Sequence, residues 1–215
     1  MAGKKVPENV AIRLSFYLRY LRKMRKEERT SSKRLAQFTG ESDVRVRKDL
    51  SYFGQFGIRG KGYEVGSLRE NISKVLGLNR EWAIALVGVG KLGKALLSSS
   101  AFKKRGFHIQ VGFDIDPEKV GKGIGNIKIY HPYKMPPIIR EQNIYMGIIT
   151  VPNEATQESA DLLIISGIKA ILNFSSASVV VPSYVKLKNV NFASQLEIIS
   201  YYIVNDRYFH PLTGD

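Results

Sequence analysis

The segment Val87-Gly88-Val89-Gly90-Lys91-Leu92-Gly93 decides the fold of this chain. The apolar run 82–87 leads into it and predicts a buried strand, and a helical pattern starts at Lys91. A second apolar run, 108–113, predicts a strand that ends in Asp114, 21 residues after the last glycine of the segment. A strand, a G-x-G-x-x-G loop, a helix, a strand and an acid, in this order, are typical of a dinucleotide-binding unit.

The three glycines of this loop have different physical roles. Gly88 allows a tight turn, Gly90 lets the backbone approach a pyrophosphate, and Gly93 lets the helix pack closely on the strand. The pyrophosphate would lie on free backbone N–H groups at the positive end of the helix dipole. The predicted phosphate-binding residues are Gly88, Val89, Gly90, Lys91, Leu92 and Gly93.

Asp114 predicts which dinucleotide is bound. Its carboxylate is placed to bond both ribose hydroxyls and would repel a 2′-phosphate. The next residue is Ile115 rather than arginine, so the pattern favours NAD(H) over NADP(H). Asp116 is a second candidate for the ribose contact, and the alternative is that it serves only as a turn residue before Pro117.

The composition excludes several classes of protein. The chain has 215 residues, enough for one large domain or two small ones, and it contains no cysteine. A disulfide framework, a thiolate nucleophile and a cysteine-based metal site are therefore excluded, and the three scattered histidines do not suggest a metal cluster. No apolar run approaches about 18 residues, and the charged N-terminus does not resemble a signal peptide. We expect a cytoplasmic protein with no membrane span and no metal.

Positive charge is concentrated in the first third of the chain. The net charge is +14, and residues 1–79 carry 18 Lys or Arg against 8 Asp or Glu. This asymmetry predicts an N-terminal module that meets a polyanion, although a solvated basic surface would show the same excess.

The N-terminal module has the pattern of a helix-turn-helix. A first helix begins near Pro7, a second spans 32–38, and Ser42 caps a third over 43–53. The residues expected to face inward are Leu35, Ala36 and Phe38 on the second helix and Val46, Leu50 and Phe53 on the third. The outer side of the third helix is basic and rich in hydroxyls, which suits a major groove. Its predicted DNA contacts are Ser42, Arg45, Arg47, Lys48, Ser51 and Tyr52.

A glycine-rich segment, 54–65, follows the third helix and predicts a β-hairpin. Arg59 and Lys61 lie at its tip, where they could enter a minor groove or bind the backbone of DNA, as in a winged helix. Ser67 and Glu70 then form a capping-box pattern that predicts a linker helix through Leu76.

The second module alternates strands and helices, which predicts a doubly wound parallel sheet of the Rossmann type. Segment 121–125 is interpreted as a surface turn, and Asn153 as the cap of a helix over 154–166. Ligands of such sheets bind beyond the carboxyl ends of the strands, so two loops should meet the nicotinamide half. The residues expected there are Thr150, Val151, Pro152, Asn173 and Phe174, with Phe192 completing a dry pocket.

The chain closes with a helical pattern over 195–209 that carries an apolar stripe. This helix must pack on its own domain or on a partner subunit. The predicted organisation is therefore an α/β protein in three parts: a winged helix-turn-helix domain over 1–78, a Rossmann domain over 79–194, and a C-terminal helix and tail over 195–215.

Several of these segments together resemble the bacterial redox-sensing transcriptional repressors of the Rex family. The resemblance covers nearly the whole chain in order, and the run Val46-Arg47-Lys48-Asp49-Leu50-Ser51-Tyr52-Phe53-Gly54 is its most specific part. The other matching segments are Arg59-Gly60-x-Gly62-Tyr63, the glycine loop, Phe113-Asp114-x-Asp116-Pro117, Thr150-Val151-Pro152 and Gly167-Ile168-Lys169-x-Ile171-Leu172-Asn173-Phe174.

The resemblance implies a homodimer in which the C-terminal helix is swapped between subunits. It also implies NAD(H) as the ligand, palindromic operators as the DNA, and repression of genes for fermentation and anaerobic respiration until NADH rises. Arg13 would act as an interdomain switch with the position of Asn191, where the family often has an acid. A family aromatic is also missing near Ser98-Ser99-Ser100.

Two other functions remain open on the residues alone. One is a small NAD-dependent dehydrogenase with a basic extension, and the other is a DNA-binding protein with a vestigial nucleotide fold. Hydride transfer usually needs a positioned acid or base, and no histidine, lysine or tyrosine adjoins Thr150 or Asn173 in the sequence. We therefore predict no catalytic residue.

Overall fold

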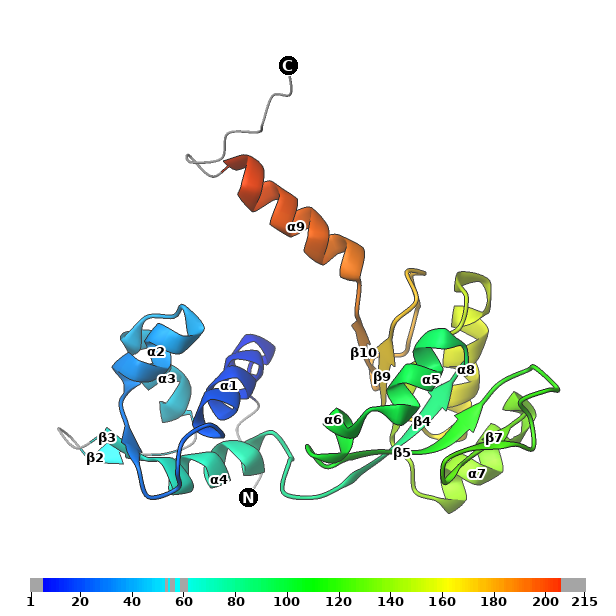
Figure 1. Cartoon of the computed structure of the whole chain (residues 1–215), viewed down its shortest axis with the longest axis horizontal. Coiled ribbons are helices and arrows are strands. Elements are labelled where there is room, and N and C mark those ends of the chain that lie inside the picture. The colour runs from blue at the N-terminus through cyan, green and yellow to red at the C-terminus, as the bar shows by residue number, and fades with distance from the viewer. Residues whose placement is uncertain (1–5, 53, 55–56, 59–61, 206–215) are drawn as a thin grey trace. The chain divides into compact units, whose positions relative to one another are not determined.

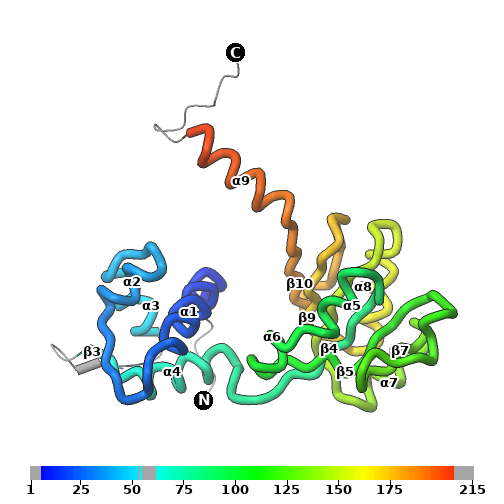
Figure 2. Tube along the Cα trace, in the orientation of Figure 1, coloured from blue at the N-terminus to red at the C-terminus, as the bar shows by residue number. Residues whose placement is uncertain are grey.

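The computed structural model describes residues 6–52, 54, 57–58 and 62–205. The chain divides into two compact units, Met1–Glu81 and Trp82–Asp215. The division falls three residues after the boundary expected at residue 78. Figure 2 traces the chain through both units.

The first unit is a winged helix. Its elements are α1 (Glu8–Leu21), β1 (Arg29–Thr30), α2 (Ser32–Thr39), α3 (Asp43–Ser51), β2 (Gly57–Ile58), β3 (Gly62–Glu64) and α4 (Val65–Val75) (Figure 1). The three strands pair antiparallel in the order β1-β3-β2, so the glycine-rich segment forms the expected hairpin.

Local caps explain where α2 begins and ends and where α3 begins. The Arg34 N–H donates to Oγ of Ser31, and the Arg45 N–H donates to Oγ of Ser42. Between the helices, Gly40 takes a left-handed φ of 71°, which only glycine adopts readily. These signals are all local, and the prediction of two short helices joined by a tight turn is confirmed.

One apolar cluster holds this unit together, and it includes the predicted inner residues Leu35, Ala36, Val46 and Leu50. Phe38 was expected inside but is 36% exposed, because it lies at the edge of the helix pair against Tyr20. Phe53 falls outside the described residues.

The capping box predicted at Ser67 and Glu70 is wrong. Helix α4 begins two residues earlier, at Val65, directly after β3. Glu70 instead forms an i,i+4 ion pair with Lys74, at 2.8 Å.

The second unit is a seven-stranded sheet with helices on both faces (Figure 1). The strands are β4 (Trp82–Val87), β5 (Phe107–Phe113), β6 (Gly123–Ile124), β7 (Ile127–Tyr130), β8 (Met146–Ile149), β9 (Ala170–Asn173) and β10 (Lys186–Asn189). The helices are α5 (Lys91–Ser98), α6 (Ser100–Lys103), η1 (Pro132–Lys134), α7 (Met135–Glu141), η2 (Asn153–Ala155), α8 (Thr156–Ser166) and α9 (Phe192–Asn205).

The strand order is β10-β9-β8-β4-β5-β7-β6, and every pair is parallel except β6 with β7. Alternate residues of β4 enter two different cores: Ala85 and Val87 pack with α7 and α8, whereas Ile84 and Leu86 pack on the side of α5 and α6. This alternation is what a strand buried on both faces requires. The predicted doubly wound α/β fold is confirmed.

Some details of this unit differ from the prediction. Segment 121–125 holds β6, which pairs with β7, rather than only a turn. Asn153 does not cap α8; it lies in a short 3₁₀ turn before the helix. Helix α7 was not predicted because Pro136 and Pro137 occupy its first turn, where a missing N–H costs little. The edge strand β10 has no apolar alternation and was also missed. Over the described residues, no helix has the length and apolar character needed to cross a membrane.

Candidate functional site

A cavity of about 550 Å³ lies in the second unit, at the carboxyl ends of β4, β5 and β8. Strand order reverses between β4 and β8, and ligands of open α/β sheets bind at such a switch point. The volume suits a ligand of nucleotide size. The cavity is lined by Gly88, Gly90, Asp114, Ile115, Asp116, Lys119, His131, Tyr133, Thr150, Val151 and Pro152, among others.

Each glycine of the loop has the surroundings expected from its predicted role. Gly88 has a φ of +90°, and a Cβ there would lie 2.8 Å from the backbone of Thr150. A Cβ on Gly93 would lie 2.1 Å from the carbonyl oxygen of Gly88, so the helix could not pack on the loop. Gly90 differs, because a Cβ there would meet no protein atom within 4 Å. Its hydrogen atoms face open cavity, which is the space a phosphate needs.

Asp114 ties the end of β5 to the glycine loop. It is only 9% exposed, and its Oδ2 accepts the Val89 N–H at 2.7 Å and the Lys119 ammonium at 3.1 Å. Its Oδ1 accepts the Asp116 N–H at 2.9 Å. Two carboxylate oxygens offer about four acceptor positions. Asp114 therefore holds the loop in place and retains limited capacity for a ribose hydroxyl.

Asp116 is the more open of the two acids. Its side chain is 37% exposed and lies 3.2 Å from the Lys119 ammonium. The Glu118 N–H and then Lys119 donate to it, and both contacts lower the pKa of Asp116. Hydrogen bonds to Asp114 and Asp116 in turn raise the pKa of Lys119. The sequence prediction did not include Lys119, although it lies five residues after Asp114 in the same loop.

The nicotinamide side of the site is only partly as expected. Thr150, Val151 and Pro152 line the cavity, and the Thr150 hydroxyl donates to the Gly88 carbonyl at 2.6 Å. Asn173 does not line the cavity. Its side chain is fully buried and donates to the Ser175 carbonyl and to Oδ1 of Asn189 on β10, so it orders the loop after β9.

Phe174 and Phe192 lie beyond the cavity lining but near each other, with ring centroids 6.3 Å apart. Phe192 is the first residue of α9 and is 63% exposed. Val89, Lys91, Leu92 and Gly93, also predicted at the phosphates, belong to the loop and the first turn of α5 and are not among the residues that line the cavity.

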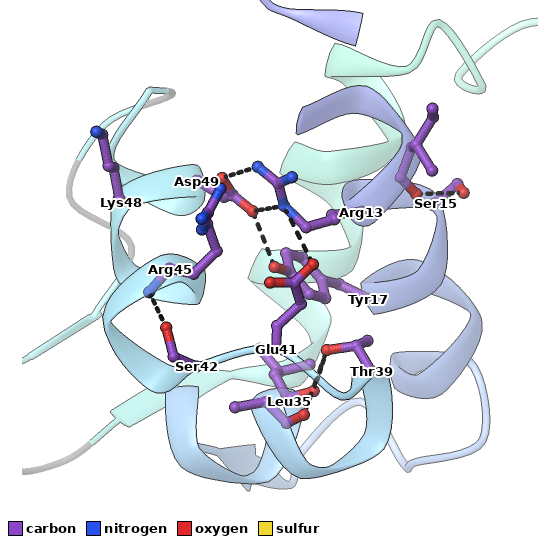
Figure 3. A network of polar contacts seen from close by, with 12 residues as sticks. Arg13, Ser15, Tyr17, Leu35, Thr39, Glu41, Ser42, Arg45, Lys48 and Asp49 are labelled. Carbon is purple, nitrogen blue, oxygen red and sulfur yellow. Dashed lines mark hydrogen bonds and ion pairs between the residues drawn. The ribbon is translucent and has the colours of Figure 1, made fainter. Parts of the chain in front are cut away.

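The candidate DNA-binding surface is the outer side of α3. Arg45 and Lys48 are exposed there, and Figure 3 shows Lys48 pointing away from the helix pair. Arg47 is also exposed, but it pairs with Asp43 at 2.6 Å. An exposed pair of this kind is weak enough to open when a phosphate approaches.

The hydroxyls expected on this surface already serve the helix. Ser42 caps α3, and the Ser51 hydroxyl donates to the Lys48 carbonyl at 2.7 Å. Tyr52, the C-cap residue, is half-buried against the core of the unit. Arg59 and Lys61, predicted at the tip of the wing, lie outside the described residues.

A buried acid lies on α3 one turn after Arg45 and three residues after Val46. Asp49 is 1% exposed and accepts hydrogen bonds from Arg13 and Tyr17 of α1 (Figure 3). Arg13 also lies 3.9 Å from Glu41. The bond to Asp49 raises the pKa of Arg13, and burial, followed by the bond to Asp49, raises the pKa of Tyr17.

The comparisons with known proteins follow the same two-part division. Residues 5–51 match the family described as putative DNA-binding protein N-terminus, and residues 79–177 match the CoA binding domain family. A redox-sensing transcriptional repressor Rex from Pelotomaculum thermopropionicum is 44% identical over 206 residues, which cover 95% of this chain and 97% of that protein. The Rex repressor of Thermus thermophilus is 41% identical and covers 98% of this chain and 100% of its own length.

This chain belongs to the Rex family. It is therefore a redox-sensing transcriptional repressor rather than an enzyme. Solved Rex-family structures agree: that of RSP in complex with β-NAD⁺ and operator DNA has a TM-score of 0.87 at 35% identity and covers 94% of each chain. RSP in complex with β-NADH gives a TM-score of 0.84 at 34% identity, covering 94% of this chain and 96% of that chain.

The interdomain switch implied by the Rex resemblance stays a prediction. Arg13 is engaged inside its own unit by Asp49, and Oδ1 of Asn191 accepts the Ser194 N–H at the start of α9. Among the described residues, no group of three or more histidine, aspartate or glutamate side chains could hold a metal ion.

The residues that the fold brings to these sites and that sequence reasoning missed include Asp49, Lys119, His131 and Tyr133. Only Asp49 had a usable signal, because it lies three residues after Val46 and so shares the inner face of α3.

Proposed function

We propose that this chain forms a homodimer that binds palindromic operators through α3 and the wing and senses the NADH/NAD⁺ ratio in the second unit. The observation that carries the proposal is one chain with two sites: a cavity at a topological switch point with an open Gly90, and a winged helix with an exposed basic helix. Relatives of this chain are crystallised with β-NAD⁺ and operator DNA and with β-NADH.

The cavity supports a definite orientation of the dinucleotide. Acids at the end of β5 mark the adenosine half in Rossmann folds. Ile115 and Tyr133, which are 74% and 83% exposed, flank this end of the cavity and offer apolar surfaces for adenine. The pyrophosphate would lie on the loop at Gly90, and the nicotinamide would lie toward Thr150.

Charge gives a physical basis for telling the two redox states apart. The oxidised nicotinamide ring is cationic, and the reduced ring is neutral. A dry pocket near Thr150, Phe174 and Phe192 would favour the neutral ring, because an unpaired charge is costly to bury. Phe174 and Phe192 already lie close enough for their rings to interact.

Two conformations are needed to turn this preference into regulation. One would space the two α3 helices of a dimer for successive major grooves, and the other would misplace them. NADH must prefer the second conformation, because a ligand with equal affinity for both shifts nothing. The genes would then be repressed until NADH rises.

The exposed helix α9 supports the dimer. Across its described residues, Phe192–Asn205, it buries no side chain, and Leu196, Ile199 and Val204 are 66%, 51% and 73% exposed. An apolar surface of this kind needs a partner. We propose that a second copy covers it by exchanging α9, and that the dimer works on DNA in the cytoplasm.

Fluorescence anisotropy on a palindromic duplex library, with NAD⁺ and NADH titrated in competition, tests the proposal. We expect tight binding to a subset of palindromes, weakened by NADH and restored by excess NAD⁺. If protein shown to be saturated with NADH keeps its full operator affinity at fixed ionic strength, the proposal fails.

A further inference from the structure

The inner face of the DNA-binding helix carries a charge that packing alone does not require. Val46 and Leu50 already bury that face of α3 in the apolar cluster of the unit. Asp49 lies beside Val46 at the edge of this apolar face and is 1% exposed, as a third inward residue of the same helix. Apolar contacts are not directional, so they leave some freedom for α3 to rotate or slide on α1.

The contacts of Asp49 remove that freedom. Its Oδ2 accepts Nε of Arg13 at 2.6 Å and the Tyr17 hydroxyl at 2.9 Å, and its Oδ1 accepts Nη2 of Arg13 at 2.7 Å (Figure 3). A guanidinium that grips both oxygens of one carboxylate has a single planar geometry. Arg13 and Tyr17 are one turn apart on α1, so the carboxylate is held from two points on that helix.

Stability is a poor explanation for this arrangement. A buried ion pair is often no more stable than well-packed apolar residues of the same volume, and its best-attested role is to fix the register of the elements that it joins. Attraction to DNA is no better an explanation, because Asp49 and the nearby Glu41 are both acids in a unit that must approach phosphates.

We propose that Asp49 is a positioning residue: gripped by Arg13 and Tyr17, it fixes the orientation of α3 on α1, and so sets which base edges Arg45 and Lys48 can reach. The residue acts through the helix and does not touch DNA. This inference rests on the proposed function of α3 as the DNA-reading helix.

Two substitutions that remove the same charge separate positioning from electrostatics. Asp49→Asn and Glu41→Gln each delete one negative charge from the first unit, but only the first breaks the grip. The Glu41 carboxylate is 3.9 Å from Arg13 and its side chain is 32% exposed. Electrostatics alone predicts that both variants bind every DNA somewhat more tightly.

A positioning role predicts that Asp49→Asn affects the preferred palindrome and a scrambled duplex differently. Its affinity for the preferred palindrome should fall by about tenfold or more, the scale of one lost bidentate base contact. Its affinity for a scrambled duplex of the same length should stay within about twofold or rise, because phosphate contacts carry no sequence information. Glu41→Gln should keep the selectivity of the unsubstituted protein.

Two further variants of the full chain protect the test against misfolding. Arg13→Lys keeps the charge and loses the planar grip, and Tyr17→Phe removes one hydrogen bond with no change of charge. Both should lose selectivity for the palindrome, Tyr17→Phe by less. Circular dichroism and thermal melting of each variant show whether it is folded before binding is measured.

The outcomes distinguish this inference from the function on which it rests. If the unsubstituted protein does not prefer any palindrome over a scrambled duplex, the proposed function is wrong. If it does, and folded Asp49→Asn keeps that preference, the positioning role is wrong. If Asp49→Asn does not fold, unchanged selectivity in both Arg13→Lys and Tyr17→Phe overturns the positioning role.

Discussion

Gly90→Ala should abolish most dinucleotide binding while leaving the fold intact. Gly90 has a φ of −79° and a ψ of −159°, a conformation open to any L-residue, and an added Cβ would meet no protein atom within 4 Å. Alanine at this N-cap position costs roughly 0.5–1 kcal/mol. Alanine also lowers the conformational entropy of the unfolded chain relative to glycine, which stabilises the folded state by about 0.4–1 kcal/mol. The net change in stability is therefore close to zero.

The expected loss of affinity for the dinucleotide follows from the open space next to Gly90, where a phosphate would lie. A methyl group on Gly90 would hold a phosphate away from the N–H groups at the start of α5, because Gly90 lines the cavity and its Cβ position is open. A hydrogen bond to a charged group contributes about 1.5–3 kcal/mol. Losing one of them should weaken NADH binding by about tenfold to a hundredfold.

Gly93→Ala is the matched control, because it should lower the stability of the fold, which Gly90→Ala should leave unchanged. Its Cβ would lie 2.1 Å from the carbonyl oxygen of Gly88, a backbone atom that cannot move aside. We expect about 1–3 kcal/mol of destabilisation. For a chain of this size, each kcal/mol lowers Tm by about 2–4 °C.

Isothermal titration with NADH and NAD⁺, together with thermal melts of the ligand-free variants, gives both quantities. Gly90→Ala should melt with the unsubstituted protein and bind poorly, and Gly93→Ala should melt early. A Gly90→Ala variant that melts normally and binds NADH with full affinity would refute the assignment of the loop as the phosphate site.

Three further predictions test other parts of the molecule. Lys48→Ala should weaken binding to all duplexes and lower the slope of log affinity against log salt by about one, and an unchanged slope would show that Lys48 contacts no phosphate. Asp116→Asn should reduce stability at neutral pH and match the unsubstituted protein in acid: the lowered pKa of Asp116 contributes stability above the unfolded carboxyl value, about 3.9, that is lost as pH falls. Urea unfolding at several pH values measures this, and a difference that persists at the acid end contradicts it. Leu196→Glu places a charge on the exposed apolar side of α9 and should convert a dimer to monomers in analytical ultracentrifugation, whereas an unaltered dimer would place the interface elsewhere.

The sequence alone determined the parts of this protein that depend on local spacing. Strand β4 was predicted with its observed bounds, because an apolar run that stops at a glycine turn is both a buried strand and its end. The caps at Ser31 and Ser42 and the left-handed Gly40 likewise act within a few residues of themselves. The glycine loop combined such signals in an order that few folds share, so the nucleotide-binding architecture followed from it.

The tertiary structure decided how individual polar groups are used. Asp114 was predicted as a ribose contact, but folding brings it the N–H of Val89, 25 residues earlier, and much of its capacity goes to the loop. Asn173 was predicted at the cofactor and is used instead by its neighbours and by Asn189 of an edge strand that has no apolar pattern. In the sequence, Asp49 is only one more charged residue of a basic helix. The fold brings Arg13, 36 residues earlier, into hydrogen-bond contact with it. The physical reason is common to all three. Hydrogen-bond partners are set by proximity in space, and the spacing of residues along a chain carries no record of which distant donor will reach a given acceptor.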